Sequence, residues 1–428
     1  MRLPETVTSS AARAAELDAS DPLRLFRDRF HIPQASDGSD AVYLCGHSLG
    51  LQPKTAAEYI REELEDWARL GVDAHFRGRH PWMPYHRLLT HQTARLVGAM
   101  PSEVVVMNSL TVNLHLMMVS FYRPTRERHK IIIEAGAFPS DQYAVKSQIR
   151  YHGFDPATSL VELRPREGDS TLRDSDILET IEREGDSVAL IMLGGVNYST
   201  GQAFNIEEIT RAGHRKGCLV GFDLAHAAGN LLLNLHDADV DFAVWCSYKY
   251  LNSGPGSTAG CFVHERHASW RGPRFEGWWG HNEGTRFRMG PDFDGTPGAE
   301  GWQLSNPPIL SLAAVRASME IFDEAGMRAL REKSVALTGY LESLLDHAQS
   351  PAFAMVTPRE PERRGAHLSL RVPSNGRAIC ARLVEEGVIC DWREPDILRV
   401  APAPLYNSYT DVYRFAERFL AAVGASPK

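Results

Sequence analysis

The chain has 428 residues, of which 43% are apolar and 23% charged, the proportions of an ordinary globular protein rather than a fibrous or disordered one. Its 46 Lys and Arg residues against 54 Asp and Glu residues give a formal charge of −8, without a basic block that would follow a phosphate backbone. We therefore expect no nucleic acid partner.

The chain also lacks the signals of a membrane or secreted protein. Its longest apolar stretch, residues 188–196, is much shorter than the roughly 20 residues that a membrane span needs. The first residues, "MRLPETVTSSAARAAELDASD", carry acids and have no apolar h-region. We expect a cytoplasmic protein with no membrane partner.

The six cysteines and one histidine pair are the candidates for disulfides or a metal site. The six cysteines form no C-x-x-C pair, and several lie in apolar runs that favour buried free thiols, so we expect neither disulfides nor structural zinc. His264 and His267 form an H-x-x-H without a third ligand at metal-site spacing. We expect surface histidines there and no metal.

Apolar runs rich in β-branched residues predict the strands of one sheet. In chain order these runs are residues 103–108, 130–136, 188–196, 218–225, 241–249 and 260–265. Their apolarity is continuous, which is typical of strands covered on both faces, and helix-like segments such as "TVNLHLMMVSFY" lie between most of them. The pattern predicts an α/β fold with a mostly parallel sheet.

The pattern changes at Pro308, where a long helical stretch begins that we expect to break near Gly326. Short strand candidates, "HLSLRV" and "ILRVAP", then alternate with the helices "AICARLVEEGV" and "DVYRFAERFLAAV". This mixture indicates a smaller α+β domain. We predict a large domain over residues 60–307 and a small one made of residues 1–59 with 308–428.

In open α/β sheets the ligand binds beyond the carboxyl ends of the strands, so polar residues there are site candidates. Leu110 and Thr111 follow the first strand at a helix start, where free amides favour a phosphate; a plain cap by Asn108 or Ser109 is the alternative. After the second strand, Phe138 offers a ring for stacking and Asp141 a hydrogen-bond acceptor, although "SD" also suits a simple helix start.

The most specific candidates are Asp223 and Lys249. Asp223 ends a wholly apolar strand, where a buried carboxylate needs a partner. Lys249 comes at the end of another predicted strand and is flanked by Tyr248 and Tyr250, in "CSYKYLNSGPGS". A structural ion pair would explain both residues. Together they are also the two fixed points of a pyridoxal phosphate site, an amine for the covalent link and a carboxylate for the ring nitrogen. We expect the two tyrosines to keep the amine dry.

These stretches resemble the kynureninase family. The order "LT", "FPSD", "DLAH", "YK", "GWWGH" and "SNPP" is similar to that family from "YLCGHSLGLQPK" near the start to "LRVAPAPLYNS" near the end. The resemblance implies a fold-type-I pyridoxal phosphate enzyme of the aspartate aminotransferase superfamily. It also implies hydrolysis of L-kynurenine to anthranilate and L-alanine, in tryptophan catabolism through the kynurenine pathway, with a place in NAD biosynthesis left open.

The resemblance also implies residue roles. Lys249, Tyr248 and Asp223 are the expected catalytic residues. The expected cofactor-binding residues are Leu110, Thr111, Phe138, Asp141, Asp223, His226, Tyr248, Lys249, Trp278 and Asn306. Arg399 is expected to bind the substrate carboxylate, with His75 and Asn306 about the aromatic ring. Family members are homodimers with shared sites, to which the partner contributes the residues matching Trp278 and Asn306.

One residue departs from the family pattern, because His47 of "CGHSLG" stands where asparagine is usual, and its effect near the substrate carboxylate stays open. The polar pair His75 and Asn306 predicts acceptance of both kynurenine and 3-hydroxykynurenine, with the preference open. Two alternatives remain. One is another fold-type-I enzyme, such as a cysteine desulfurase or a class V aminotransferase, and the other is a non-catalytic protein that keeps the fold.

Overall fold

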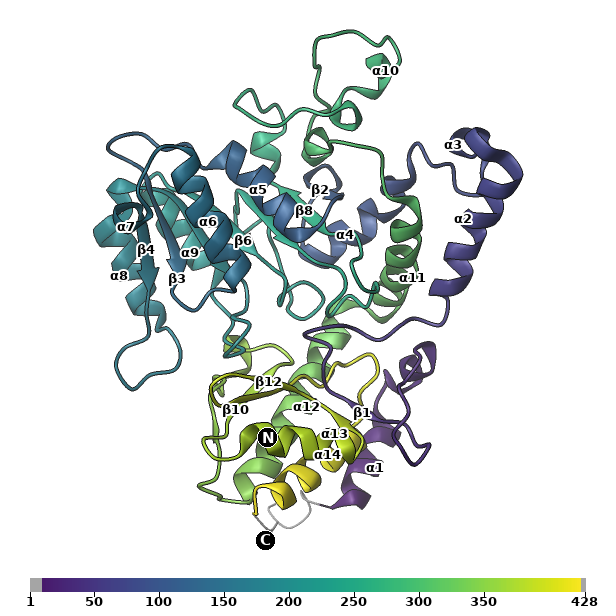
Figure 1. Cartoon of the computed structure of the whole chain (residues 1–428), viewed down its shortest axis with the longest axis vertical. Coiled ribbons are helices and arrows are strands. Elements are labelled where there is room, and N and C mark those ends of the chain that lie inside the picture. The colour runs from purple at the N-terminus through teal and green to yellow at the C-terminus, as the bar shows by residue number, and fades with distance from the viewer. Residues whose placement is uncertain (1–9, 425–428) are drawn as a thin grey trace.

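The computed structural model describes residues 10–424 and contains two main sheets. Figure 1 shows the larger sheet in one half of the molecule and the smaller one in the other half, with helices α11 and α12 running between them. The α11 helix spans Ile309–Ala325 and α12 spans Met327–His347. They are separated at Gly326, whose φ of +76° is a conformation that favours glycine, so the predicted break is confirmed.

The large sheet has seven strands in the order β2-β8-β7-β6-β5-β3-β4. Their bounds are β2 Val104–Val106, β3 Lys130–Glu134, β4 Leu160–Leu163, β5 Val188–Gly194, β6 Leu219–Asp223, β7 Phe242–Trp245 and β8 Gly260–Val263. Strands β4, β3, β5, β6 and β7 run parallel, and β8 is antiparallel to both of its neighbours. The predicted α/β class is confirmed. The sequence did not predict β4, a half-exposed edge strand without a continuous apolar run.

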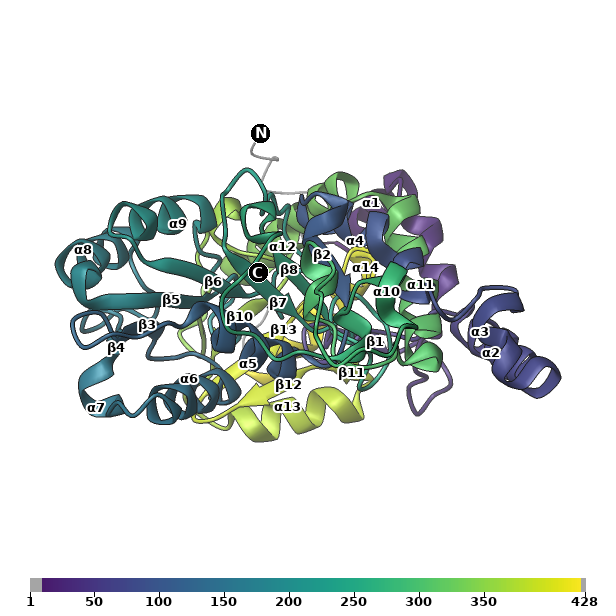
Figure 2. The same cartoon turned by 90° about the horizontal axis from the view of Figure 1, so that it is seen from above.

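Helices cover both faces of this sheet, as the parallel order requires. Seen from above, α8 and α9 lie on one side of the strands and α6 on the other (Figure 2). The bounds of these helices and their neighbours are α4 Thr90–Val97, α5 Leu110–Phe121, α6 Pro139–Tyr151, α7 Pro156–Ser159, α8 Asp174–Glu184 and α9 Ile206–Arg215.

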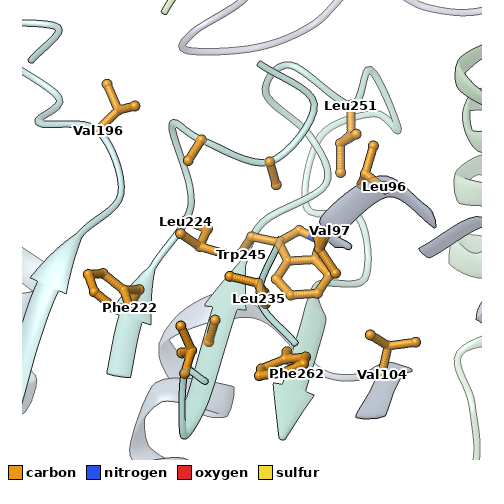
Figure 3. Close-up of a cluster of buried hydrophobic side chains, with 14 of the residues drawn as sticks. Leu96, Val97, Val104, Val196, Phe222, Leu224, Leu235, Trp245, Leu251 and Phe262 are labelled. Atoms are coloured by element: carbon orange, nitrogen blue, oxygen red, sulfur yellow. The ribbon is translucent and has the colours of Figure 1, made fainter. Parts of the chain in front are cut away.

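A large buried cluster packs beneath the strand ends. Figure 3 shows Phe222 and Leu224 on either side of the end of β6, beside Trp245 of β7 and Phe262 of β8. All four side chains are buried. Close packing of large side chains leaves little freedom to shift, so it fixes the register at which β6 and β7 present the residues that follow them.

The smaller sheet has four antiparallel strands in the order β12-β13-β10-β9. Its bounds are β9 Ala354–Met355, β10 Leu368–Arg371, β12 Asp391–Arg393 and β13 Ile397–Val400, with helices α13 Gly376–Glu385 and α14 Tyr409–Ala422. Near the start of the chain, α1 (Ala11–Ser20) packs on α14, and β1 (Val42–Tyr43) pairs with β11 (Val388–Ile389). The N-terminal segment thus shares a second buried cluster with the C-terminal part.

Two segments project from this body. Helices α2 (Ala56–Leu70) and α3 (Ala74–Arg77) form one arm, and the loop around α10 (Glu283–Arg286) forms the other (Figure 1). We call them the α2–α3 arm and the α10 loop. Within residues 10–424 no helix combines the length and apolarity that crossing a membrane requires.

The H-x-x-H pair is not at the surface, so that prediction is wrong. His264 is buried, and His267 Nε2 lies 2.8 Å from a carboxylate oxygen of Asp241. The sequence could not show that Asp241, which precedes β7, would turn toward this pair. All six cysteines are buried, in line with the apolar runs that contain several of them.

Candidate active site

One cavity of about 190 Å³ gathers eight of the predicted site residues at the carboxyl ends of the strands. They are Leu110, Thr111, Phe138, Asp141, Asp223, His226, Tyr248 and Lys249. The strands that precede these residues, β2, β3, β6 and β7, belong to one sheet although they are far apart in the sequence, and β6 and β7 are neighbours in it. The fold thus collects at one point a set of residues that the chain scatters over 140 positions.

Lys249 is half-buried at the centre of this set. Its Nζ lies 3.2 Å from His226 Nε2, and it faces the rings of Phe138 and Tyr248 at 5.8 and 5.9 Å. Burial lowers the pKa of His226 well below its usual range, and the charge of Lys249 adds to this shift. The imidazole is therefore neutral and accepts a hydrogen bond from the lysine amine.

Tyr250 does not wall the amine as expected. Its ring lies in a small buried cluster with Ala366 and Ala401. The chain bends at residues 247–249 and turns at 250–251, after β7 has ended, so strand alternation does not hold here, and Tyr248 lines the cavity together with Lys249. The second wall comes instead from Phe138, a residue more than a hundred positions earlier.

The loop "CGHSLG" of residues 45–50 packs directly on the Lys249 main chain. The Gly50 amide donates to the Tyr248 carbonyl at 2.8 Å, and a Cβ on Gly50 would lie only 2.4 Å from the Lys249 carbonyl oxygen. A side chain at this position would push the lysine out of place. The glycine of this loop therefore serves the close approach of two main-chain segments.

Asp223 and Asp141 lie in the same cavity, where each carboxyl group affects the pKa of the other. Asp223 accepts a hydrogen bond from the Ala225 amide at 2.7 Å, and burial raises its pKa even though Lys249 opposes the shift. Burial and the charge of Asp223 raise the pKa of Asp141 well above its usual range. Two close buried carboxyls cannot both ionise, so Asp141 holds the proton and Asp223 carries the charge.

The start of α5 leaves its amides available to an anion. Ser109 is the N-cap residue, yet its side chain makes no capping hydrogen bond. Asn108 has a φ of +52°, and its side-chain Nδ2 donates to Asn113 Oδ1 at 3.0 Å. The alternative of a plain side-chain cap by these residues is thus not observed, and the N-terminal end at Leu110 and Thr111 keeps unspent donors.

These residues fit the cofactor that the sequence predicts. A phosphate would find the helix start, and a flat ring would lie against Phe138, which is 44% exposed and therefore free to stack. The ring nitrogen would find the carboxylate of Asp223. His226 Nδ1 is buried without a partner, a polar atom that a bound group would satisfy.

Arg399 lies behind the cavity, on β13. It is 1% exposed and reaches the cavity through Tyr198, whose carbonyl accepts from Arg399 Nη1 at 2.6 Å. Its Nη2 pairs with Asp391, and its Nε has no hydrogen-bond partner among residues 10–424. The buried guanidinium therefore has one N–H donor free, which a substrate carboxylate could accept from.

His47, the residue that departs from the family pattern, touches this anchor. Its Nε2 lies 3.4 Å from Asp391, and its ring stacks on His367 with centroids 5.0 Å apart. Burial lowers the pKa of His47 to about 4, so it is neutral at physiological pH. The pKa of Asp391 is held below its usual range by His47 and Arg399, although burial opposes this.

Three predicted residues lie away from the cavity within this chain. His75 is on the α2–α3 arm, Asn306 is exposed, and Trp278 lies in a short helical turn near the α10 loop, 40% exposed and packed edge-on against Phe287. None of the three is among the residues, within 10–424, that line the cavity. For Trp278 and Asn306, this is the geometry that sites shared between two subunits would require.

Other residues also line the cavity, and among them Glu134, Asn197 and Tyr198 were not predicted from the sequence. Glu134 carried a usable signal, because it is a charged residue at the end of the apolar strand "KIIIE", as Asp223 is at the end of β6. Asn197 and Tyr198 lie in the loop after β5. They had no signal apart from that position.

Comparison with known proteins gives concordant results. A family model described as "Kynureninase C-terminal domain" matches residues 330–419. A kynureninase of Koribacter versatilis is 71% identical, over 95% of this chain and 96% of that protein. One of Myxococcus xanthus is 64% identical, over 97% and 98%.

Solved structures of related fold are much more distant in sequence. A cysteine desulfurase of Escherichia coli has a TM-score of 0.75 at 17% identity, covering 94% of this chain and 98% of that one. A cysteine desulfurase of Thermococcus onnurineus has a TM-score of 0.71 at 17% identity, over 97% of both chains. At such identity the likeness concerns the fold alone, which agrees with the fold-type-I architecture expected from the sequence.

Proposed function

Because this chain belongs to the kynureninase family, we propose that it hydrolyses L-kynurenine to anthranilate and L-alanine with pyridoxal 5′-phosphate as cofactor. The observation that carries the proposal is that Lys249 and Asp223 line one cavity together with an uncapped helix start. An amine, a charged carboxylate and a phosphate seat are what this cofactor needs.

The cofactor, when bound, supplies an electron sink for the Cα of a linked amino acid. Lys249 would hold the cofactor and, once released by the substrate amine, take and return the Cα proton. Asp223 would keep a negative charge beside the ring nitrogen and so hold a proton on it. Burial raises the pKa of Tyr248, which keeps its hydroxyl protonated and suits it to donate a proton to the Cβ of the alanine portion that remains when anthranilate leaves.

Arg399 would bind the substrate carboxylate through its unspent donor, since a guanidinium pairs well with a carboxylate. We propose that 3-hydroxy-L-kynurenine is accepted as well, with His75 and Asn306 near the ring of the substrate. A site that hydrogen-bonds a hydroxyl penalises a substrate that lacks it. Comparing kcat/KM for the two substrates tests this, and a strong bias against the hydroxylated one would contradict it.

We further propose a homodimer in which Trp278 and Asn306 complete the site of the other subunit. The support is their distance from the cavity of their own chain and the exposure of large apolar side chains on both projecting segments. These side chains are Leu64, Trp67, Val72 and Phe76 on the α2–α3 arm, and Phe275, Trp278, Phe287 and Met289 around the α10 loop. A cytoplasmic location is part of the proposal, since six free thiols suit a reducing compartment.

The direct experiment is incubation of the purified protein, loaded with pyridoxal phosphate, with L-kynurenine while anthranilate fluorescence is followed. We expect anthranilate and L-alanine in equal amounts, and none with Lys249→Ala. L-cysteine serves as the competing substrate. Sulfide release without anthranilate formation would favour the desulfurase alternative, which the burial of all six cysteines already disfavours because that reaction needs a mobile catalytic cysteine.

Subunit sharing has a separate test, in which Lys249→Ala and Trp278→Ala chains are unfolded together and refolded as mixed dimers. If sites are shared, each mixed dimer has one site with both residues intact, and the mixture recovers about a quarter of the wild-type activity. If each site lies within one chain, every site carries one defect and nothing is recovered.

A further inference from the structure

Glu134 is a buried carboxylate in the cavity wall that the roles above leave unexplained. It ends β3 and is 3% exposed, and no Lys, Arg or His in the described part of the chain forms an ion pair with it. Burial raises its pKa to about 7, and the charge of Asp223 adds to the shift. Burying a carboxyl group without an ion pair costs stability, so we expect its hydrogen bonds to serve the function of the site.

Those hydrogen bonds go to the last residue of β5 and to the loop that follows it. One oxygen of Glu134 accepts from the Gly194 amide at 3.0 Å, and the other accepts from Asn197 Nδ2 at 2.7 Å. The Asn197 side-chain oxygen in turn accepts from the amides of Ser199 and Thr200 at 3.0 and 2.9 Å. Glu134 therefore orients Asn197, and Asn197 closes the turn formed by residues 197–200.

This turn touches both halves of the site. The ring of Tyr198 lies edge-on to Phe138, with centroids 5.1 Å apart and planes at 89°. Its main-chain carbonyl accepts from Arg399 Nη1 at 2.6 Å. One residue of the turn thus contacts the stacking ring of the cofactor cavity and the guanidinium proposed for the substrate carboxylate.

The turn is also anchored on the small sheet. The Ser199 carbonyl accepts from the Ser369 hydroxyl, and the Thr200 carbonyl accepts from the Thr357 hydroxyl. Ser369 pairs directly with Arg399 in the β10–β13 ladder. The turn of residues 197–200 is therefore a bridge from the end of β3 to the strand that carries Arg399.

We propose that Glu134 is a positioning residue of this active site, which through Asn197 and the turn of residues 197–200 sets Tyr198 against Phe138 and holds Arg399 where the substrate carboxylate binds. The inference rests on the proposed function for the identity of the substrate. It assigns to Glu134 a role in binding the amino-acid end of that substrate and no contact with the reacting atoms.

The test is Glu134→Gln, which keeps the shape but presents an amide N–H to one of the two donors, so one hydrogen bond is lost. We expect KM for kynurenine to rise about tenfold while kcat changes less than about threefold, since the lost hydrogen bond loosens the groups that bind the substrate and not those that react. We expect the Kd of the loaded enzyme for L-alanine, read from the visible spectrum, to rise by a similar factor.

Glu103 provides a matched control. It is also fully buried and accepts from the Met100 and Glu265 amides at 2.7 and 2.8 Å and from His236 at 2.9 Å, but it does not line the cavity. Glu103→Gln should lower the thermal midpoint and leave KM and the L-alanine Kd unchanged. If Glu134→Gln behaves in the same way as this control, the positioning role is wrong.

A double-variant cycle with Arg399→Lys gives a second criterion. If Glu134 acts through Arg399, the two changes together should raise the L-alanine Kd by clearly less than the product of their separate effects. Independent, multiplying effects would overturn the proposal. Should Glu134→Gln fail to fold, Asn197→Ala releases the same turn and must give the same rise in KM and Kd.

The readouts separate this inference from the proposed function. If the wild-type enzyme forms no anthranilate, the substrate assignment fails. The L-alanine Kd still reports whether Glu134 holds the carboxylate anchor. If anthranilate forms and the Kd does not respond to either variant of the turn, only the role of Glu134 fails.

Discussion

The cavity and the two projecting segments differ in what they bury, since the cavity buries polar groups and the segments expose apolar ones. In the cavity, charged and polar groups such as Asp141 and Asp223 are buried beside one another. On the α2–α3 arm, apolar side chains stand in water, with Trp67 and Phe76 each 60% exposed. The cavity holds the predicted cofactor-binding residues around Lys249, whereas the predicted residues His75 and Trp278 lie on or near the projecting segments and do not line it. This difference is what the proposed homodimer with shared sites would explain.

A substitution in the cavity should reduce activity more than one in the projecting segments. Lys249→Ala removes the amine that we propose holds the cofactor and moves the Cα proton, so we expect kcat to fall by at least about 10³-fold. The visible absorption of the lysine-linked cofactor should disappear with it. Full turnover with an unchanged spectrum would contradict the assignment of Lys249.

The projecting arm should give the next largest effect. Replacing Trp67 and Phe76 together by Glu puts charges into the proposed subunit interface, where aromatic side chains carry much of the binding energy. We expect the dimer Kd, measured by sedimentation, to rise about 100-fold or more, and activity to fall at low enzyme concentration. Tyr151→Glu is the matched control, because Tyr151 is also an exposed aromatic, 76% exposed, on α6.

Arg399→Lys should be milder than either. A lysine keeps the charge but loses the fork that pairs with a carboxylate, so we expect KM for kynurenine to rise about 10- to 100-fold with a smaller change in kcat. Arg393→Lys is the control, since Arg393 also donates to Asp391, at 3.0 Å, but does not contact the Tyr198 loop in the way Arg399 does. Equal KM values for the two variants would argue against Arg399 as the anchor.

The last prediction has the smallest effect on activity, because it concerns His47 and the dependence of stability on pH. Burial lowers its pKa to about 4, whereas an unfolded histidine has a pKa of about 6.5. Between these values the unfolded state binds more protons, so this residue makes the protein lose stability as the pH falls, by on the order of 3 kcal/mol in all. Urea unfolding of His47→Asn should show a shallower loss between about pH 6.5 and 4 than the wild type. An unchanged slope would mean that His47 is not held neutral by burial.

The strand ends account for most of what could be predicted about the site. Leu110, Thr111, Phe138, Asp141, Asp223 and Lys249 each follow an apolar run, and the structure gathers all of them, with His226 and Tyr248, at one cavity. The same rule applies to Glu134, which ends the apolar run "KIIIE" and lines the cavity but was not among the predicted residues. The predicted domain boundaries and the residue roles stay predictions.

The sequence alone determined the α/β class, the break at Gly326 and the chemistry available at the strand ends, because apolar periodicity and glycine conformation are local properties of the chain. The tertiary structure decided which polar groups face each other. That Tyr250 turns away from the amine, that His264 is buried, and that Asn197 joins Glu134 to the strand of Arg399 all depend on contacts between segments distant in sequence. Such contacts are fixed by packing around the whole core, and no local pattern encodes them.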